Sequence, residues 1–237
     1  MSQQGKTPDP VTSEAPPTDC SSCGRSSQYC VCAWVKRVET KTKILVLQHP
    51  QEPGVAIGTA PIIESCFSNS VVVTGLSWSN LKKILRRDIV YQEWGVLYLG
   101  SIRVEKLPDT GLYSVTDKGV VRPDQKALLA KLKGIIVLDG TWSQAKTLWW
   151  RNAWLLKLQR LVIRSDATSL YDTIRKEPRK GCLSSIEALA ESLDILERTD
   201  GHIQEAVQKP LGELVSRLRK KKKSSRPSLH RRRRYER

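Results

Sequence analysis

The 237-residue sequence lacks the features that mark membrane and exported proteins. No stretch approaches the roughly 20 consecutive apolar residues that span a bilayer. No basic segment followed by an apolar one opens the chain, as a secretory signal would. We therefore expect neither class. Residues 1–19 also lack aromatic side chains and are rich in Pro, Ser, Thr and Gln, which predicts a disordered segment.

The motifs of several enzyme classes are missing as well. There is no Gly-rich phosphate loop of nucleotide hydrolases, no Gly-x-Ser-x-Gly and no His-Glu-x-x-His. With three histidines in the chain, a Ser–His–Asp triad would need His49 or His202, and neither lies in a recognisable context. These routes to hydrolysis are not supported.

Positive charge is abundant, but it is unevenly placed. The net charge is +16, and residues 216–237 hold twelve Lys or Arg against one acid, Glu236. A mildly basic globule with a strongly basic tail suits a polyanion, with nucleic acid as the first candidate and an acidic membrane surface as the second. A tail that merely aids solubility is the alternative.

Four of the six cysteines lie close together, at Cys20, Cys23, Cys30 and Cys32. Two close pairs on short turns can place four thiolates at the corners of a tetrahedron, the geometry that Zn²⁺ prefers. Two disulfides are the rival interpretation, and without an export signal the compartment is expected to be reducing. We predict a structural zinc module over residues 20–36, and small buried side chains at Cys66 and Cys182.

Strand-like and helix-like segments alternate from Lys43 to about Arg219, which predicts an α/β domain with a mostly parallel sheet. The apolar run 134–138 predicts a strand covered on both faces. We expect strands at 44–47, 71–73, 96–99, 134–138 and 161–163, and helices at 59–67, 76–87, 126–133, from 141, at 183–196 and at 203–218.

The loop after the apolar strand is the best candidate for chemistry, because ligands of such sheets bind beyond the carboxyl ends of the strands. The strand delivers Asp139, Gly140 permits a sharp turn, and Thr141 and Gln144 have capping-box spacing. A helix N-terminus there offers N–H groups to an anion. Asp139 as a simple helix cap is the alternative, although Thr141 already holds the better capping position.

Two further loops carry polar residues of interest. The first is 48–52 (Gln-His-Pro-Gln-Glu), with Thr59 downstream, although a lone histidine is weak evidence for catalysis. The second is 175–181 (Arg-Lys-Glu-Pro-Arg-Lys-Gly), which precedes a second capping box at Ser184 and Glu187. This basic loop suits phosphates, and a solvated charged loop is the equal alternative.

Residues 139–146 (Asp-Gly-Thr-Trp-Ser-Gln-Ala-Lys) resemble the signature of the DTW-domain proteins. The four-cysteine segment, the 49–52 loop with Thr59, and Arg-Lys-Glu-Pro at 175–178 running into 181–187 follow that family's order. The resemblance spans about residues 20–196. It implies a SPOUT-like fold with a trefoil knot, although such knots are very rare and no periodicity indicates one.

The resemblance also implies a tRNA-uridine aminocarboxypropyltransferase, which moves the 3-amino-3-carboxypropyl group of S-adenosylmethionine to N3 of a uridine and releases methylthioadenosine. Asp139 is then the expected general base. The cofactor neighbours that it implies are His49, Glu52, Thr59, Leu138, Asp139, Thr141 and Trp142. The RNA contacts expected from the loop, the signature and the tail are Lys146, Arg175, Lys176, Arg179, Lys180, Lys220, Lys221, Lys222 and Lys223, although the loop bases could instead hold the cofactor carboxylate.

Two positions depart from the family pattern. The family has Tyr-Pro and a small residue after the third strand, whereas this chain has Tyr98-Leu99-Gly100-Ser101. The aromatic expected three residues before Arg175 comes one position early, as Tyr171.

The expected division is a disordered segment 1–19, a zinc module 20–36, a catalytic domain 37–215 and a disordered basic tail 216–237. We expect a cytoplasmic monomer, with a nuclear location if the source is eukaryotic, because 220–223 and 231–234 resemble a two-part nuclear localisation signal. The rival functions are an rRNA aminocarboxypropyltransferase, a SPOUT-type RNA methyltransferase and a non-enzymatic zinc-knuckle RNA-binding or assembly factor.

Overall fold

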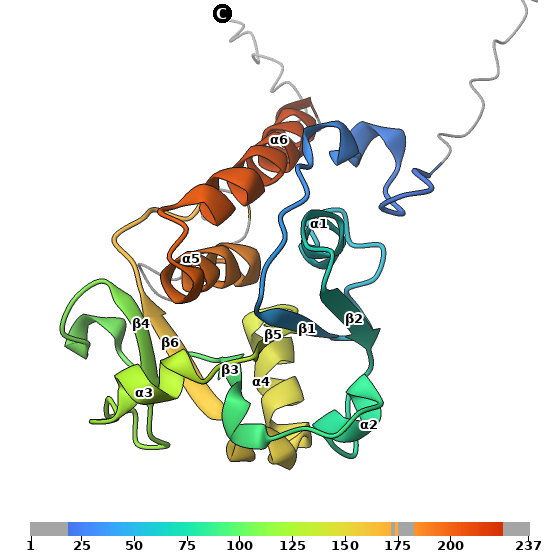
Figure 1. Cartoon of the computed structure of the whole chain (residues 1–237). Coiled ribbons are helices and arrows are strands. Elements are labelled where there is room, and N and C mark those ends of the chain that lie inside the picture. The colour runs from blue at the N-terminus through green and yellow to red at the C-terminus, as the bar shows by residue number, and fades with distance from the viewer. Residues whose placement is uncertain (1–18, 172–173, 175–182, 225–237) are drawn as a thin grey trace, which may run out of the picture.

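The computed structural model describes residues 19–171, 174 and 183–224 and is built around one six-stranded sheet, in the order β2-β1-β5-β3-β6-β4 (Figure 1). The strands are β1 (Lys43–Gln48), β2 (Ser70–Thr74), β3 (Trp94–Leu97), β4 (Gly111–Val115), β5 (Gly134–Asp139) and β6 (Gln159–Arg164). Neighbouring strands are parallel except β4, which runs antiparallel to β6. The predicted α/β class with a mostly parallel sheet is confirmed.

Helices cover both faces of this sheet. They are α1 (Ala60–Cys66), α2 (Leu81–Leu85), α3 (Gln125–Ala130), α4 (Trp142–Arg151), α5 (Ser185–Glu197) and α6 (His202–Ser224). Short 3₁₀ turns complete the chain: η1 (Ser27–Tyr29), η2 (Cys32–Trp34), η3 (Tyr91–Glu93), η4 (Val104–Lys106) and η5 (Ala153–Lys157). Helices α1, α5 and α6 pack on one face, and α2, α4 and η5 pack on the other.

The alternation of side chains along β5 explains the two-layered core. Ile135 and Val137 join the core under α5 and α6, whereas Ile136 and Leu138 join the core under α2 and α4. All six residues of β5 are buried, which confirms the strand expected from the uninterrupted apolar run.

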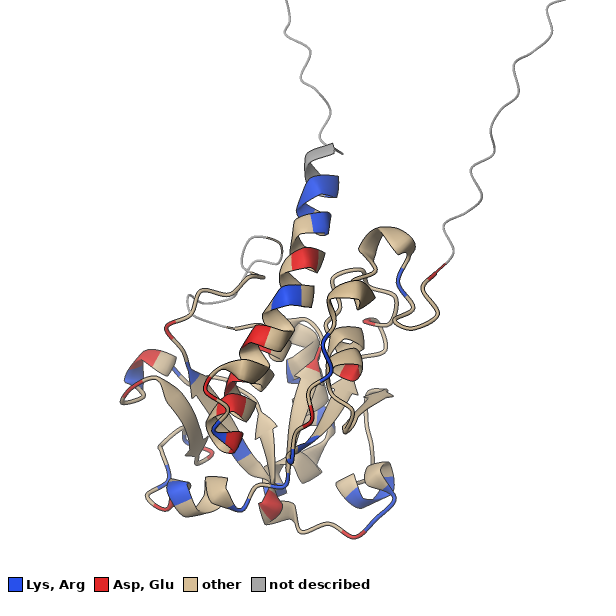
Figure 2. Cartoon of the chain, turned by 45° about the horizontal axis from the view of Figure 1, so that its top comes forward, with Lys and Arg blue, Asp and Glu red and all other residues tan. Residues whose placement is uncertain are grey.

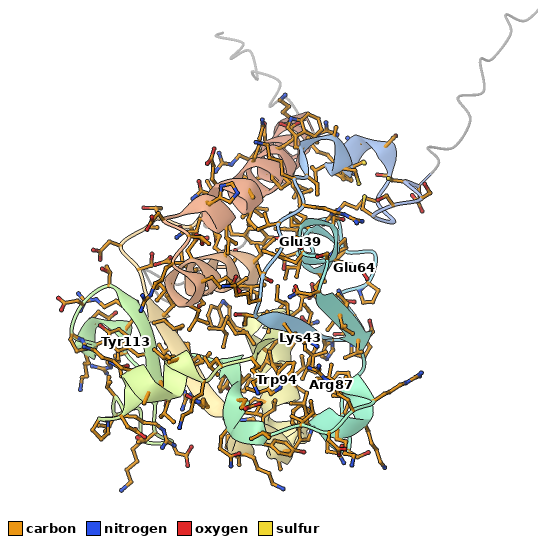
Figure 3. The ribbon with its side chains drawn as sticks, in the orientation of Figure 1. Glu39, Lys43, Glu64, Arg87, Trp94 and Tyr113 are labelled. Carbon is orange, nitrogen blue, oxygen red and sulfur yellow. The ribbon has the colours of Figure 1, made fainter. Side chains whose placement is uncertain are left out.

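The helix expected at 76–87 is shorter in the structure, because Asn80 caps it late. The Asn80 side chain accepts a hydrogen bond from the N–H of Lys83, at 2.8 Å, so α2 begins at Leu81. The preceding residues form a loop in which the N–H of Trp78 donates to Asn152 at 2.8 Å. After α2, Arg87 lies over the ring of Trp94, 5.9 Å from its centroid (Figure 3).

Two further elements differ from expectation. Strand β4 was not predicted, because its five residues include Gly111 and Ser114 and follow a loop of turn-forming residues. The last helix, expected at about 203–218, continues to Ser224, so the start of the tail expected to be disordered is helical. No helix in the described ranges is long and apolar enough to cross a membrane.

Candidate active site and metal site

Asp139 ends the central strand β5 and is buried, with 4% of its surface exposed. Its Oδ2 accepts a hydrogen bond from Nε2 of Gln48 at 3.1 Å, and its Oδ1 accepts one from the hydroxyl of Thr59 at 3.0 Å. Both donors are neutral, so they fix the orientation of the carboxylate without bringing a formal charge to it.

Each of these donors is itself positioned by the fold. Gln48 pairs directly with Asp139 across the parallel strands β1 and β5, and its Oε1 accepts a hydrogen bond from Thr74 of β2 at 3.0 Å. Thr59 is the N-cap residue of α1, but its hydroxyl makes no capping bond and is directed to Asp139 instead. Three neighbouring strands and one helix start therefore hold this carboxylate.

Gly140 makes the turn from β5 into α4, with a φ of 155°. A Cβ at this position would lie 2.9 Å from Cβ of Gln144 and 3.4 Å from Cβ of His49, so glycine is required here. The predicted capping box follows: Thr141 and Gln144 exchange hydrogen bonds at the start of α4, at 2.6 and 3.2 Å.

A pocket opens beside Asp139, between two helix N-termini. Thr141 and Trp142 of the α4 start line it on one side, and Ser184 and Ser185 of the α5 start line it on the other. Apolar side chains from β3, β5 and β6 form much of its remaining wall, namely Leu97, Val137, Leu138, Leu161, Val162 and Ile163, and Leu99 comes from the loop after β3. Such a pocket combines an apolar body with N–H groups suited to an anion.

The loop after β3 forms part of this wall and is held by Arg160 of β6. The Arg160 guanidinium donates to the carbonyl oxygens of Tyr98 and Leu99, at 3.0 and 2.6 Å. It also lies over the stacked rings of Tyr98 and Trp149, which are 4.3 Å apart. Burial lowers the pKa of Arg160 and raises that of Tyr98.

The loop 49–58 is attached from two sides. The guanidinium of Arg25, which is buried, donates to the carbonyl oxygen of Gly58. The Tyr171 hydroxyl, also buried, donates to the carbonyl oxygen of Ile57. Because Gly58 directly precedes Thr59, the cysteine segment that carries Arg25 contacts the chain one residue before a partner of Asp139.

Cys20, Cys23, Cys30 and Cys32 form the second candidate site. Their sulfur atoms all lie within 4.8 Å of one another, and those of Cys20 and Cys32 are 3.8 Å apart. A tetrahedron with metal–sulfur bonds of about 2.3 Å has edges of about 3.8 Å, so four thiolates at this spacing can hold one metal ion. Hydrogen bonding, chiefly from the backbone N–H of Cys23, lowers the pKa of Cys20 to about 6, whereas burial raises that of Cys32 to about 12.

The cysteine segment packs against the end of α6 (Figure 1). Arg217 lies over the ring of Trp34, 4.7 Å from its centroid, and donates to the carbonyl oxygen of Cys30 at 2.9 Å. Lys221 lies over the ring of Tyr29, at 5.3 Å. The basic end of α6 therefore stabilises the four-cysteine site as well as carrying charge.

The structure gathers most of the predicted cofactor residues in one place. Thr59, Leu138, Asp139, Thr141 and Trp142 line the pocket. His49 and Glu52 lie in the adjoining loop and are not part of the lining. The His49 N–H donates to the carbonyl oxygen of Asp139 at 3.0 Å, so its contact with the site runs through the main chain.

The predicted RNA-binding residues fall in three places. Lys146 is exposed on α4, and Lys220 and Lys221 are exposed on the last turns of α6. Lys222 and Lys223 continue that helix, and their side chains are outside the described part. Arg175, Lys176, Arg179 and Lys180, together with Cys182, lie outside the described residues.

Comparison with known proteins settles the family, because the DTW domain model matches residues 17–219. The chain belongs to the DTW domain family. Over 210 residues it is 28% identical to the Macaca fascicularis protein named tRNA-uridine aminocarboxypropyltransferase 2, covering 84% of this chain and 62% of that protein. Over 228 residues it is 25% identical to tRNA-uridine aminocarboxypropyltransferase A of Arabidopsis thaliana, covering 83% of this chain and 79% of that one. The chain thus spans 62% of the length of its macaque relative. No solved structure gives a significant match.

Sequence reasoning gave no role to three residues of this DTW domain that position the site: Gln48, Arg25 and Arg160. Gln48 begins the 48–52 loop that the sequence indicated, but its place beside Asp139 follows from the order of the strands. Arg25 and Arg160 act on main-chain oxygens 33 and 61 residues away in sequence. No local pattern reveals such contacts.

Proposed function

We propose that this chain transfers the 3-amino-3-carboxypropyl group of S-adenosylmethionine to N3 of a uridine in tRNA, with release of methylthioadenosine. Membership of the DTW domain family and the names of its relatives support a tRNA-uridine aminocarboxypropyltransferase. The observation that carries the proposal is the buried carboxylate of Asp139, hydrogen-bonded to Gln48 and Thr59, at the wall of a pocket between two helix starts.

The reaction needs a group that accepts a proton, because N3 of uridine is a poor nucleophile while it holds one. Asp139 takes that proton as N3 forms its bond to the γ-carbon of the aminocarboxypropyl group. The carbon–sulfur bond breaks at the same carbon, and its electron pair neutralises the sulfonium to give the thioether. The Asp139 proton is then returned to solvent. Transfer of this group rather than the methyl group depends on which carbon faces N3.

The pocket fits this donor in its chemistry. Leu138 and its apolar neighbours provide a surface for the nucleoside, and Trp142 offers an aromatic face at the rim. The N-termini of α4 and α5 present N–H groups to a carboxylate, within a helix dipole of favourable sign. The residues that we assign to the donor site are therefore Thr59, Leu138, Asp139, Thr141 and Trp142.

We assign Zn²⁺ to the four-cysteine site. A set of four sulfur ligands in tetrahedral spacing is the usual donor set of structural zinc. The ion would fix the turns of residues 20–32 and keep Arg25 in place against the loop before Thr59. It would have no part in the transfer step.

Asp139→Asn tests the proposal. We expect no detectable transfer, because the amide cannot accept the N3 proton. The fold should persist, since the amide oxygen can still accept from Gln48 and the Thr59 hydroxyl can turn to accept from the amide. Binding of S-adenosylmethionine, measured by calorimetry, should be retained, and nucleoside mass spectrometry of the tRNA should show no modified uridine. Full activity in this variant would remove Asp139 from the mechanism.

A further inference from the structure

An exposed stripe runs along α4, away from the pocket that Trp142 lines. Residues Trp142, Lys146 and Trp150 are spaced four apart, so they follow one another along one side of the helix. Trp142 is 44% exposed and Trp150 is 71% exposed, and Lys146 between them is exposed as well. The neighbouring side of α4, with Ala145, Leu148 and Trp149, packs on the sheet.

Two exposed tryptophans on one stripe need an explanation, because exposing a large apolar ring to water is unfavourable. Trp149 of the same helix, by contrast, packs against the core. The stripe also begins at the proposed active site, since Trp142 lines the pocket that holds Asp139. A ligand that entered the pocket from solvent beside α4 would therefore meet this stripe first.

Charge indicates what kind of ligand the stripe accepts. The α4–η5 segment, residues 142–157, contains Lys146, Arg151 and Lys157 and no acid. Helix α2 packs into the same core cluster on the same face of the sheet and adds Lys83, as well as Lys82, which is paired with Asp88. Such a face attracts a polyanion.

The junction of α5 and α6, on the other face of the sheet, has the opposite charge. From 184 to 205, where α5 leads into α6, the chain contains six Asp or Glu and one basic residue, Arg198. Figure 2 shows the acidic residues gathered where α5 ends and α6 begins, and basic residues on α2. The junction of α5 and α6 therefore repels a polyanion, whereas the α4 side attracts one.

We propose that the Trp142–Lys146–Trp150 stripe is a docking surface for the unpaired loop of the substrate RNA. This inference rests on the proposed function, because it assigns to that same pocket the path by which the RNA reaches it. Trp150 stacks on a base near the target uridine, and Lys146 contacts a backbone phosphate. Proteins commonly bind unpaired bases by stacking them on exposed aromatic rings. Along a nucleic-acid strand a phosphate lies between successive bases, and along this stripe a Lys lies between two aromatic rings.

Binding of an unmodified tRNA transcript to the full chain tests this surface without any need for turnover. We expect Trp150→Ala to weaken the affinity about tenfold, and Trp150→Phe to retain most of it, because the ring remains. Lys146→Ala should weaken the affinity and reduce the slope of log affinity against log salt by about 0.7 to 0.9. Ile195→Ala, an exposed apolar residue on α5, and Lys131→Ala, an exposed Lys after α3, are the matched controls.

Turnover separates this inference from the proposed function. In a transfer assay, Trp150→Ala should raise the KM for tRNA and leave the KM for S-adenosylmethionine unchanged. If the wild-type chain transferred nothing, the proposed function would fail. The binding measurement would still show whether the stripe binds tRNA. Wild-type affinity in both Trp150→Ala and Lys146→Ala would overturn the inference. So would a wild-type dimer in sedimentation that Trp150→Ala dissociates, because the stripe would then be a contact between two copies.

Discussion

The position and orientation of the Asp139 carboxylate depend on individual side chains, and the sequence pattern predicts only some of them. Its position at the end of an apolar strand, the glycine turn and the capping box of Thr141 were all predicted from local spacing, and the structure contains them. The hydrogen-bond donors Gln48 and Thr59 come from β1 and from the start of α1, 91 and 80 residues away in sequence. Which side chain faces which atom follows from strand order, and local periodicity does not contain that order.

A substitution at Thr59 tests whether this residue orients Asp139 for turnover. Thr59→Val keeps the shape of the side chain but removes the hydroxyl that donates to Asp139. A hydrogen bond to a charged group contributes about 1.5–3 kcal/mol, so we expect kcat to fall roughly tenfold to a hundredfold. Steady-state kinetics with saturating tRNA would measure this.

Thr59→Ser is the matched control for that prediction. It restores the hydroxyl and should recover most of the lost kcat. A valine variant with wild-type kcat would show that orientation of Asp139 by Thr59 does not matter for turnover.

The cysteine segment contacts the loop that leads to the candidate active site. Arg25 leaves that segment and donates to the carbonyl oxygen of Gly58, one residue before Thr59. We expect Arg25→Met, which keeps the apolar stem, to lower kcat by about threefold to tenfold, because loop 49–58 loses a hydrogen bond that holds it. The zinc content, measured by elemental analysis, should remain at one ion per chain.

Arg37→Met, at an exposed position between the cysteine segment and β1, is the control and should behave as wild type. If Arg25→Met lost its zinc together with its activity, Arg25 would be a structural residue of the metal module. Normal activity with normal zinc would contradict the link between the two sites.

Helix α5 carries a pH-sensitive carboxyl. Burial, with smaller effects from the nearby acids Asp194, Asp166 and Glu187, raises the pKa of Glu191, although a hydrogen bond with Ser165 opposes the shift. A folded pKa above the unfolded value of 4.5 means that the folded state holds this proton more strongly. Stability is therefore lost as pH rises from the unfolded value through the raised one.

Glu191→Gln removes the ionisation and should raise Tm by about 1–3 °C at pH 7.5, with no gain at pH 4. Thermal unfolding followed by circular dichroism at both pH values measures the effect. Glu39→Gln, an exposed position labelled in Figure 3, is the control. An equal gain at both pH values would show that charge on Glu191 is not the cause.

At the scale of the whole molecule, the class of the fold was predictable and its connections were not. The buried run of β5 and the alternation of strands and helices predicted a mostly parallel α/β sheet, and the structure has one. The antiparallel edge strand β4 was missed, because its sequence has few β-formers and its pairing with β6 joins residues about 50 apart. The SPOUT-like knot implied by the family resemblance stays a prediction.

The basic C-terminal region divides into two parts that an experiment should treat separately. Up to Ser224 its residues belong to α6, and Arg217 and Lys221 contact the cysteine segment, so a deletion from 216 would damage that site. We expect deletion of 225–237 alone, which removes six Arg and one Glu, to keep transfer activity. The slope of log tRNA affinity against log salt should become shallower by at most about five. An unchanged slope would show that these residues make no phosphate contacts.

The most direct test of the central claim uses the full chain, unmodified tRNA transcripts and S-adenosylmethionine labelled either in the carboxyl carbon or in the methyl group. Transfer of the aminocarboxypropyl group predicts that the carboxyl label enters the RNA while the methyl label leaves as methylthioadenosine. Methyl label in the RNA would contradict the account and make the chain a methyltransferase. Absence of both labels from every tRNA would also contradict it.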